Sequence, residues 1–286
     1  MTTQHTENLE LGRATTHERS EALNLVYAAL ASTDRQQAVD ATLGELRAGK
    51  LSAQALHVAR RGGRLVGAAL AKPHPGRTAV VWPPQLTAAT PELVADQLFA
   101  QIDAQLATEG VVIAQVLAHR DAPQDVPRIR RAGYDHLTDL EYLVCGLEHL
   151  SAADVEAHDD GSLTFETYRE SQASRLAQLI QRTYEGTRDC PQLNDVRDMH
   201  DVLAGHRATG QFTPERWSFV LRDGVDVGCL LLAHHFGSTT WELVYMGIVP
   251  TARGGGDGLR IVRYAQHSAA SHGATSLVLA MDTSND

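Results

Sequence analysis

The sequence predicts an α/β fold of the α+β type, with mixed sheets, built as two similar halves. Strand-like runs of β-branched and aromatic residues alternate with amphipathic helical patterns along the chain. The same order of elements begins again after an acidic, small-residue stretch at residues 151–162. In the second half only, a strand-like run passes through clustered glycines into a helical pattern. With 286 residues, the chain is long enough for two domains.

The first half, residues 1–150, begins with a polar segment that we expect to be frayed. Leu23 and Val26 fall on one face of the first helical pattern, and residues 90–92, Thr-Pro-Glu, make a favourable helix start. The predicted helices cover residues 16–30, 34–47, 90–110 and 127–132. The predicted strands cover residues 55–60, 65–71, 78–82, 111–118 and 137–147, the last of which we expect to close this half.

Residues 151–162 are expected to be a linker because they have no apolar period. The second half, residues 163–286, then repeats the plan of the first. Asp223-Gly224 is a strong hairpin signal between two strands. The predicted strands cover residues 163–168, 217–222, 225–234, 239–249 and 276–281. The predicted helices cover residues 171–184, 194–207 and 259–273.

Composition narrows the class of protein. The formal net charge is −10, which disfavours a nucleic-acid partner, since phosphate backbones attract basic surfaces. The cysteines number three and form no CxxC pair, which favours reduced thiols and a cytoplasmic location. The N-terminus has no apolar core of a secretory signal, and no apolar run is long enough to span a membrane. We therefore expect a soluble cytoplasmic protein without a membrane partner.

The glycine-rich stretch of the second half, residues 241–258 (WELVYMGIVPTARGGGDG), is the strongest chemical signal in the chain. A strand, a glycine loop and a helix start in this order make an anion site, because free backbone N–H groups at a helix N-terminus attract phosphate. The stretch lacks the Lys-Ser/Thr pair of a nucleotide P-loop and the GxGxxG spacing of a dinucleotide site.

This stretch resembles the acetyl-CoA loop of the GNAT N-acetyltransferase superfamily, Q/R-x-x-G-x-G/A, after a strand that ends in Val-Pro. Arg253, Gly256 and Gly258 occupy the motif positions after Val249-Pro250. The resemblance implies two tandem GNAT-like domains and acetyl-CoA as the acyl donor. It implies that the donor's diphosphate lies on the loop residues Arg253, Gly254, Gly255, Gly256, Asp257 and Gly258. It also implies that the pantetheine arm pairs with Met246, Gly247, Ile248 and Val249.

Two side chains of the loop carry further expectations. Arg253 is expected to close over the loop. The carboxylate of Asp257 would repel a phosphate, so we expect that side chain to point outward.

Glu242 is the candidate general base. Residues 242–248, ELVYMGI, resemble the E-x-V-x-x-x-I pattern of histone-type members, whose glutamate deprotonates the amine. Strict alternation places Glu242 on one face with Val244, Met246 and Ile248, and such apolar surroundings raise a carboxyl pKa. The alternative is that Glu242 only lies on the solvent face of the strand.

Other polar candidates receive structural interpretations. His234 and His235 could supply a second base or metal ligands. Adjacent strand residues face opposite ways and cannot easily bind one metal ion, so structural or surface roles are favoured and no metal is expected. Tyr184, Tyr245 and Tyr264 are expected to be core aromatics.

The sequence departs from the family in both halves. Between Trp82 and Pro91 there is no glycine loop, so the first half resembles a degenerate, non-catalytic GNAT-like domain. The second half ends at Asp286, where Asn285 matches the residue that usually opens the fourth helix. Without that helix and the last strands of the family, no general acid can be assigned. Residues 276–281 are then expected at an open sheet edge, unless the sequence is truncated after Asp286, or another segment or a second subunit, as in a homodimer, covers the edge.

Three functional hypotheses follow. The first is an acyl-CoA-dependent N-acyltransferase that acetylates a small-molecule amine or a peptide, with Glu242 as the base. The second is a non-catalytic CoA-binding regulator or scaffold with the same fold. The third is a nucleotide-phosphate binder.

Overall fold

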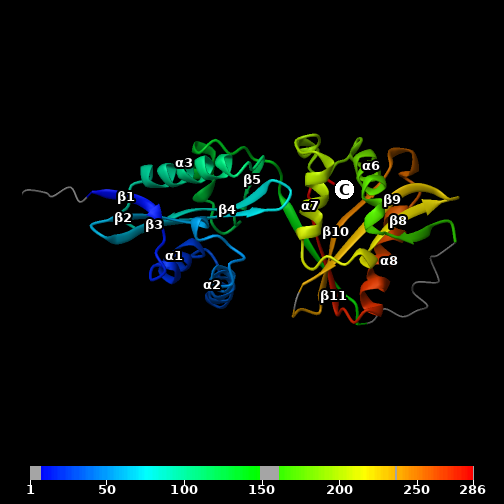
Figure 1. The fold of residues 1–286 in the computed structure, drawn as a ribbon, viewed down its shortest axis with the longest axis horizontal. Helices are drawn as coiled ribbons and strands as arrows, with labels where there is room; N and C mark the ends of the chain where they lie inside the picture. Colours follow the sequence, from blue (N-terminus) through cyan, green and yellow to red (C-terminus); the bar gives the residue numbers. More distant parts are fainter. Residues whose placement is uncertain (1–7, 149–160, 236, 286) are drawn as a thin grey trace, which may run out of the picture. The chain divides into compact units, whose positions relative to one another are not determined.

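The computed structural model describes residues 8–148, 161–235 and 237–285, which form two compact units, residues 1–136 and 137–286 (Figure 1). Each unit holds a mixed sheet covered by helices, so the predicted fold class is confirmed. Residues 151–160 of the predicted linker lie outside the described residues. None of the described helices combines the length and the apolar character needed to cross a bilayer.

The N-terminal sheet has the order β1-β2-β3-β4-β5. All neighbours are antiparallel except β4 and β5, which are parallel. The strands are β1 (Leu9–Arg13), β2 (Leu56–Arg61), β3 (Arg64–His74), β4 (Thr78–Leu86) and β5 (Ile113–Val116). The sequence analysis did not predict β1, because its segment LELGR has five residues and no β-branched or aromatic residue, and pairing with β2 stabilises the strand.

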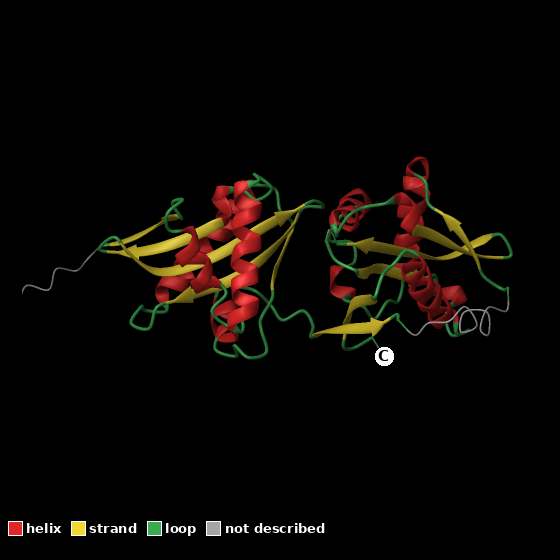
Figure 2. Cartoon of the chain, turned by 90° about the horizontal axis from the view of Figure 1, so that it is seen from below, coloured by secondary structure: helices red, strands yellow, loops and turns green. Residues whose placement is uncertain are grey.

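Helices cover both faces of the N-terminal sheet, with α3 on one side and α1 and α2 on the other (Figures 1 and 2). Helices α1 (Arg19–Val26) and α2 (Ser32–Arg47) pack on one face around Leu23 and Leu56. Helix α3 (Leu93–Thr108) packs on the other face through Leu98 and Ile102, and α4 (Asp125–Arg131) packs beside it.

The C-terminal sheet has the order β6-β11-β10-β9-β8-β7. Its strands are β6 (Leu140–Gly146), β7 (Thr164–Thr167), β8 (Trp217–Arg222), β9 (Val225–His234), β10 (Thr240–Ile248) and β11 (Ser276–Asp282). The predicted hairpin turn is confirmed: Asp223 and Gly224 both have positive φ, as a type I′ turn requires. Helices α6 (Ala173–Tyr184) and α7 (Met199–Ala208) pack on one face of the sheet, and α8 (Asp257–Ser271) packs on the other.

Strand β6 completes the C-terminal sheet, and the expectation that residues 137–147 close the first half is wrong. All seven residues of β6 pair antiparallel with β11, from Leu140↔Asp282 to Gly146↔Ser276. Leu147, just after the strand, is buried in the same core cluster as Leu277. The edge of β11 that the sequence left open is therefore covered by an earlier segment of the same chain.

A β-bulge at Val244 changes which side chains of β10 share a face. Leu243 pairs with Leu232 and Tyr245 pairs with Leu231, so Val244 has no partner on β9. Trp241, Leu243 and Met246 consequently pack on the α8 face, whereas Tyr245 packs on the α6 face. The predicted alternation placed Glu242 on a face with Met246, which is wrong, because the bulge shifts the period by one residue.

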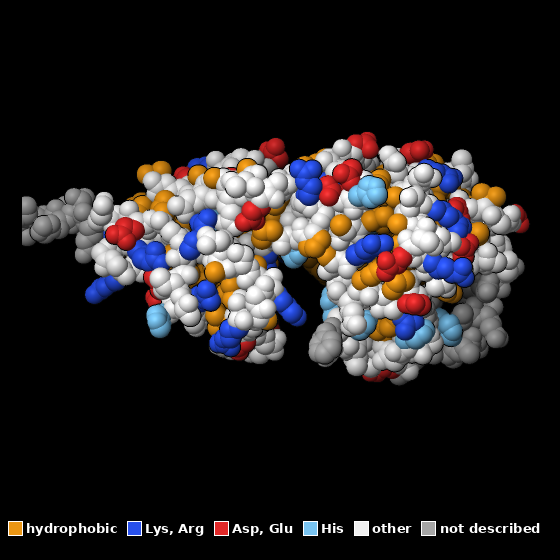
Figure 3. Space-filling view, viewed as in Figure 1, with side chains coloured by type: hydrophobic (Ala, Val, Ile, Leu, Met, Phe, Trp, Pro, Cys, Tyr) orange, Lys and Arg blue, Asp and Glu red, His pale blue; other side chains and the backbone are white. Residues whose placement is uncertain are grey.

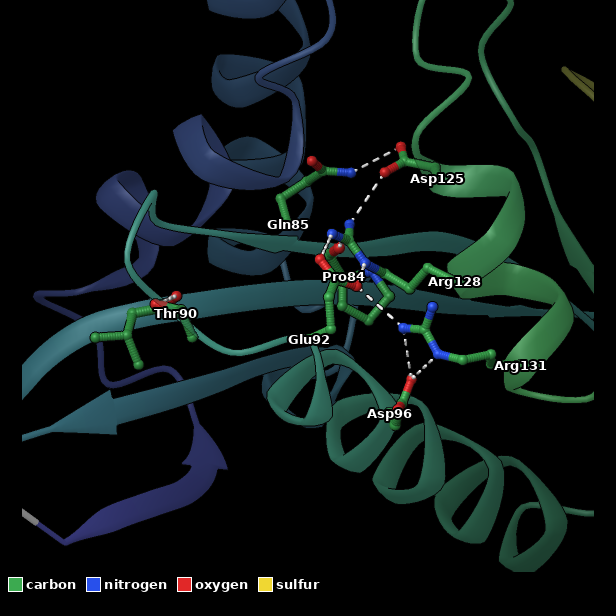
Figure 4. Close-up of polar contacts among 9 residues, drawn as sticks. Pro84, Gln85, Thr90, Glu92, Asp96, Asp125, Arg128 and Arg131 are labelled. Atoms are coloured by element: carbon green, nitrogen blue, oxygen red, sulfur yellow. Dashed lines mark hydrogen bonds and ion pairs between the residues drawn. The ribbon is translucent and has the colours of Figure 1, made fainter.

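A network of ion pairs surrounds the start of α3 in the N-terminal unit (Figure 4). The Arg128 side chain, from α4, donates to Glu92 (2.7 and 3.0 Å), to Asp125 (3.0 Å) and to the carbonyl oxygen of Pro84 (2.7 Å). Its hydrogen bonds lower the pKa of Glu92 to about 2. The stabilisation from this ion pair is therefore present above the ordinary glutamate pKa and is lost as the pH falls towards 2.

We predict that the C-terminal unit needs β6 for its stability. A fragment of residues 137–286 should fold cooperatively and stay monomeric. A fragment of residues 163–286 should unfold at lower urea concentration and self-associate, because it exposes the edge of β11. Urea unfolding and size-exclusion chromatography would measure this. Equal midpoints and equal elution behaviour for the two fragments would contradict the role of β6.

The buried part of the Arg128 network gives a second prediction. Arg128→Met should destabilise the protein by about 3 kcal/mol, because it leaves the buried Asp125 carboxylate without its cation. Arg131→Met is the matched control: Arg131 also pairs with Glu92 but its side chain is 42% exposed, so the loss should be below about 1 kcal/mol. Urea unfolding of both variants tests the difference, and equal losses would refute it.

Candidate functional site

The glycine loop joins the C-terminal end of β10 to the start of α8. After β10, Val249 is buried, a 3-10 turn (η5, Pro250–Ala252) follows, and α8 begins at Asp257. Gly254 and Gly256 have φ values of 85° and 84°, which residues other than glycine rarely adopt. These two glycines therefore set the path of the loop into the helix.

Backbone N–H groups at the start of α8 lack partners. Among the described residues, none of the N–H groups from Gly254 to Leu259 donates a hydrogen bond, and the first to do so is that of Arg260, to the Gly256 oxygen. The N–H group of Arg253 is already used, because it donates to Pro250 within η5. The unbonded donors thus run from Gly254 onward, at the positive end of a 15-residue helix.

Asp257 is buried, and the expectation that it points outward is wrong. Its side chain accepts a hydrogen bond from Arg222, at the end of β8, and one from Arg260 at 3.0 Å. Two guanidinium groups outweigh one carboxylate, so the loop retains a net positive charge. The Arg222 guanidinium also lies beside the loop, 3.9 Å from the place where a Cβ of Gly255 would stand.

The Arg253 side chain lies on the α6 side of the loop. It donates from Nε to the Ile248 oxygen (2.9 Å), from Nη1 to the Gly186 oxygen (3.0 Å) and from Nη2 to the Thr183 oxygen (2.7 Å). These contacts face the end of α6, whereas the sequence led us to expect a side chain closed over the glycines.

The strand before the loop is paired on one side only over most of its length. The parallel ladder between β10 and β11 extends from Thr240↔Ser276 to Glu242↔Val278 and stops there, although both strands continue. On the other side, β10 stays paired with β9 as far as Ile248↔Gly228. The edge of β10 that faces β11 therefore has no strand partner over residues 243–248, which include Met246, Gly247 and Ile248.

Gly247 is required by the close packing of β10 against α6. A Cβ at this position would lie 2.5 Å from Thr183 Oγ1 and 2.7 Å from Tyr245 Oη. The two hydroxyl groups are themselves hydrogen-bonded at 2.6 Å. By contrast, a Cβ on Gly258 would meet only side-chain atoms of Met246 and Ile248 at ordinary contact distances.

Glu242 lies at the last pair of the β10–β11 ladder and is bonded to a histidine. Its Oε2 is 2.7 Å from Nε2 of His235, which follows the end of β9. The Glu242 side chain is 29% exposed and that of His235 is 44% exposed, so the pair reaches from the sheet to solvent. Sequence reasoning gave His235 a structural or surface role. Strand pairing is the signal that could have revealed this contact. Glu242 pairs with Ala233, and His235 lies two residues further along the same chain segment, which makes it a diagonal neighbour of Glu242.

The end of β11 carries a second polar cluster that the sequence did not reveal. Side-chain ligand atoms of Asp189, Cys190 and Asp282 lie within 4.8 Å of one another. The Asp282 carboxylate already accepts bonds from Thr138 Oγ1, from Ser284 and from the Cys190 N–H group, and these bonds lower its pKa. The cluster therefore acts as a structural joint between the loop after α6 and the end of β11.

The equivalent helix start in the N-terminal unit is built differently. Along the chain, helix α3 connects the parallel strands β4 and β5, and α8 connects the parallel strands β10 and β11 in the same way. Before α3, the chain carries no glycine, and the Glu92 carboxylate is held there by arginines of α4. An internal carboxylate thus stands at the helix start where the C-terminal unit has glycines and unbonded N–H groups.

Comparisons with known proteins identify the fold. No protein-family model matches the chain, and no curated protein is similar to it in sequence. A GCN5-related N-acetyltransferase from Sphaerobacter thermophilus matches with a TM-score of 0.64 at 12% identity, over 96% of this chain and 87% of that chain. The GCN5-related glucosamine N-acetyltransferase region of a fungal multi-domain GH3 β-N-acetylglucosaminidase matches with a TM-score of 0.63 at 14% identity, over 95% of this chain and 35% of that longer chain.

A tandem GNAT protein from the clavulanic acid biosynthesis pathway matches with a TM-score of 0.52 at 14% identity, over 98% of this chain and 91% of that chain. The match spans both units, so the tandem arrangement predicted from the sequence is confirmed. The chain has the fold of the GCN5-related N-acetyltransferase superfamily, present twice in tandem.

Proposed function

We propose that the chain is an acyl-CoA-dependent N-acyltransferase, which transfers an acetyl group from acetyl-CoA to a primary amine in its C-terminal unit. The observation that carries the proposal is the combination at the end of β10. There, an unpaired strand edge leads directly to unbonded N–H groups at the start of α8. An extended arm that ends in a diphosphate fits such a surface, because the arm can bond to the strand edge and the diphosphate to the helix start.

The residues that would hold the donor follow from this arrangement. Main-chain groups among Met246, Gly247, Ile248 and Val249 would pair with the pantetheine arm. Two of these groups are already used: the Val249 N–H group donates to Val227, and the Ile248 oxygen accepts from Arg253. The N–H groups of the loop would bind the diphosphate, without that of Arg253, which already donates to Pro250; the binding residues are Gly254, Gly255, Gly256, Asp257 and Gly258. When bound, acetyl-CoA supplies an activated thioester, whose C–S bond breaks as the new amide bond forms.

Glu242 is the residue that we propose to take the proton from the attacking amine. It lies where the β10–β11 ladder ends, beside the unpaired edge that would hold the thioester. His235 contacts its Oε2 and holds the carboxylate in one orientation. A base must be in place before it can act, and a hydrogen bond from a neighbouring ring reduces the freedom of the carboxylate.

We propose a small-molecule amine or a peptide as the acceptor. On the face of the C-terminal unit drawn in Figure 3, basic and acidic side chains are interspersed rather than gathered into one basic region. The net charge of −10 also favours a cationic amine over a polyanion. For the N-terminal unit we propose no donor binding, since Glu92 already places a carboxylate at its helix start.

Donor binding gives a direct test. Acetyl-CoA and CoA should raise the melting temperature of the protein, by an amount that grows with ligand concentration, whereas ATP and NAD should not. Gly256→Ala should weaken CoA binding about tenfold, because a side chain at φ 84° strains or moves the loop. Gly237→Ala is the control, a surface glycine with similar φ of 74° outside the loop. No shift with CoA at any concentration would end the proposal, and a shift with ATP alone would favour a nucleotide binder.

Catalysis gives a separate test. Glu242→Gln should lower kcat/KM for acetyl transfer by about 10²–10³-fold, because the amide keeps the shape of the side chain but cannot take a proton. Thiol release with a set of amines would measure this, with Glu170→Gln, an exposed glutamate, as the control. Full activity in Glu242→Gln would remove Glu242 from the mechanism. Tight CoA binding without turnover on any amine would favour the regulator hypothesis.

A further inference from the structure

The loop after α6 is fastened at both ends. We call residues 183–190 the strap: it runs from the last turn of α6 to the residue before the 3-10 helix η3 (Pro191–Leu193). At its first end, the Arg253 guanidinium donates to the carbonyl oxygens of Thr183 and Gly186, while its Nε bonds Ile248 at the end of β10. Arg253 therefore ties the strap to the strand that precedes the glycine loop.

The second end of the strap is tied to β11. The N–H group of Cys190 donates to Asp282 Oδ2 (3.1 Å), and the N–H group of Asp282 donates to Asp189 Oδ1 (3.3 Å). The Ser284 hydroxyl donates to the Arg188 oxygen (3.4 Å). Cys190 has a φ of 42°, a conformation that a non-glycine residue adopts only when its surroundings hold it there.

The strap joins two strand ends that are not bonded to each other. The β10–β11 ladder stops at Glu242↔Val278, whereas the strap contacts Ile248 through Arg253 and also contacts Asp282 directly. The separation of the two strand ends is thus fixed partly through the strap. The strap also continues α6, which packs on the Tyr245 face of β10, and the Tyr245 hydroxyl bonds Thr183.

We propose that Arg253 is a positioning residue, which fixes the strap between the ends of β10 and β11, and that its side chain is not a ligand of the donor's phosphates. Its three bonds to main-chain oxygens use the planar fork of the guanidinium in three directions, which a lysine cannot reproduce. Through them it holds the strap across the gap between β10 and β11, which opens where the ladder stops at Glu242↔Val278. This inference rests on the proposed function for the entry of the amine into that gap, but the tie itself can be tested without turnover.

The experiment compares Arg253→Lys and Arg253→Ala with the wild type by three measurements. Hydrogen–deuterium exchange of residues 183–190 should become about tenfold faster in both variants. The KM for the amine should rise about tenfold, and the Kd for CoA from calorimetry should change less than about threefold. Arg263→Ala is the matched control, since Arg263 lies in the same helix as the loop's end and forms no bond with the described strap residues.

The hydrogen exchange of the strap and the Kd for CoA together decide between a positioning role and a phosphate-binding role for Arg253. Unchanged exchange in the strap together with a weakened Kd for CoA would overturn the proposal and make Arg253 a phosphate ligand. Faster exchange with an unchanged Kd would support it, even if no amine is turned over and the proposed function fails. If Arg253→Ala does not fold, Arg253→Lys keeps the charge and the stem, and its exchange pattern and Kd give the same decision.

Discussion

The early end of the pairing between β10 and β11 is the constraint on which the C-terminal unit depends. Backbone polar groups in a folded protein need partners, and a strand edge without a neighbour leaves a row of them unused. Here the row ends at a helix start whose own N–H groups are also unbonded among the described residues. The glycines of the loop leave the strand edge and the helix start open, because they have no side chains. Helix α6 and the strap border them through their contacts with Tyr245 and Ile248.

The starts of α3 and α8, the two helices that connect parallel strands, differ in where their acidic side chain lies. In the N-terminal unit, the carboxylate of Glu92 stands at the helix start without capping its N–H groups, and it is paired with Arg128 and Arg131. In the C-terminal unit, the acidic residue Asp257 is turned into the protein, where Arg222 and Arg260 hold it. One helix start therefore already carries a carboxylate of the chain, which would repel an anion, and the other has its carboxylate buried and can bind an anion from solution.

Local patterns predicted the elements well, and long-range contacts explain what was missed. The hairpin at Asp223-Gly224, the strand before Pro250 and the helix after the glycines follow from turn chemistry and period, and the structure contains them. The partner of β6 could not be predicted, because its sequence fits either sheet and only the pairing with β11 decides. The bulge at Val244 leaves no signature in the sequence, yet it reverses the face of every later side chain in the strand. The contacts of Arg253 with the end of α6 are also tertiary and have no local signal.

The course of β6 has a consequence for how the protein forms during synthesis. Thr138, beside β6, bonds Asp282, which lies 144 residues later in the sequence. On the ribosome, β6 emerges long before β11, so it must wait without its neighbour while most of the C-terminal half is translated. Contacts between such distant segments slow folding, since a long loop must close before they form. During that interval its apolar residues Tyr142 and Val144, which stay largely exposed even in the finished sheet, make β6 a natural target for chaperones.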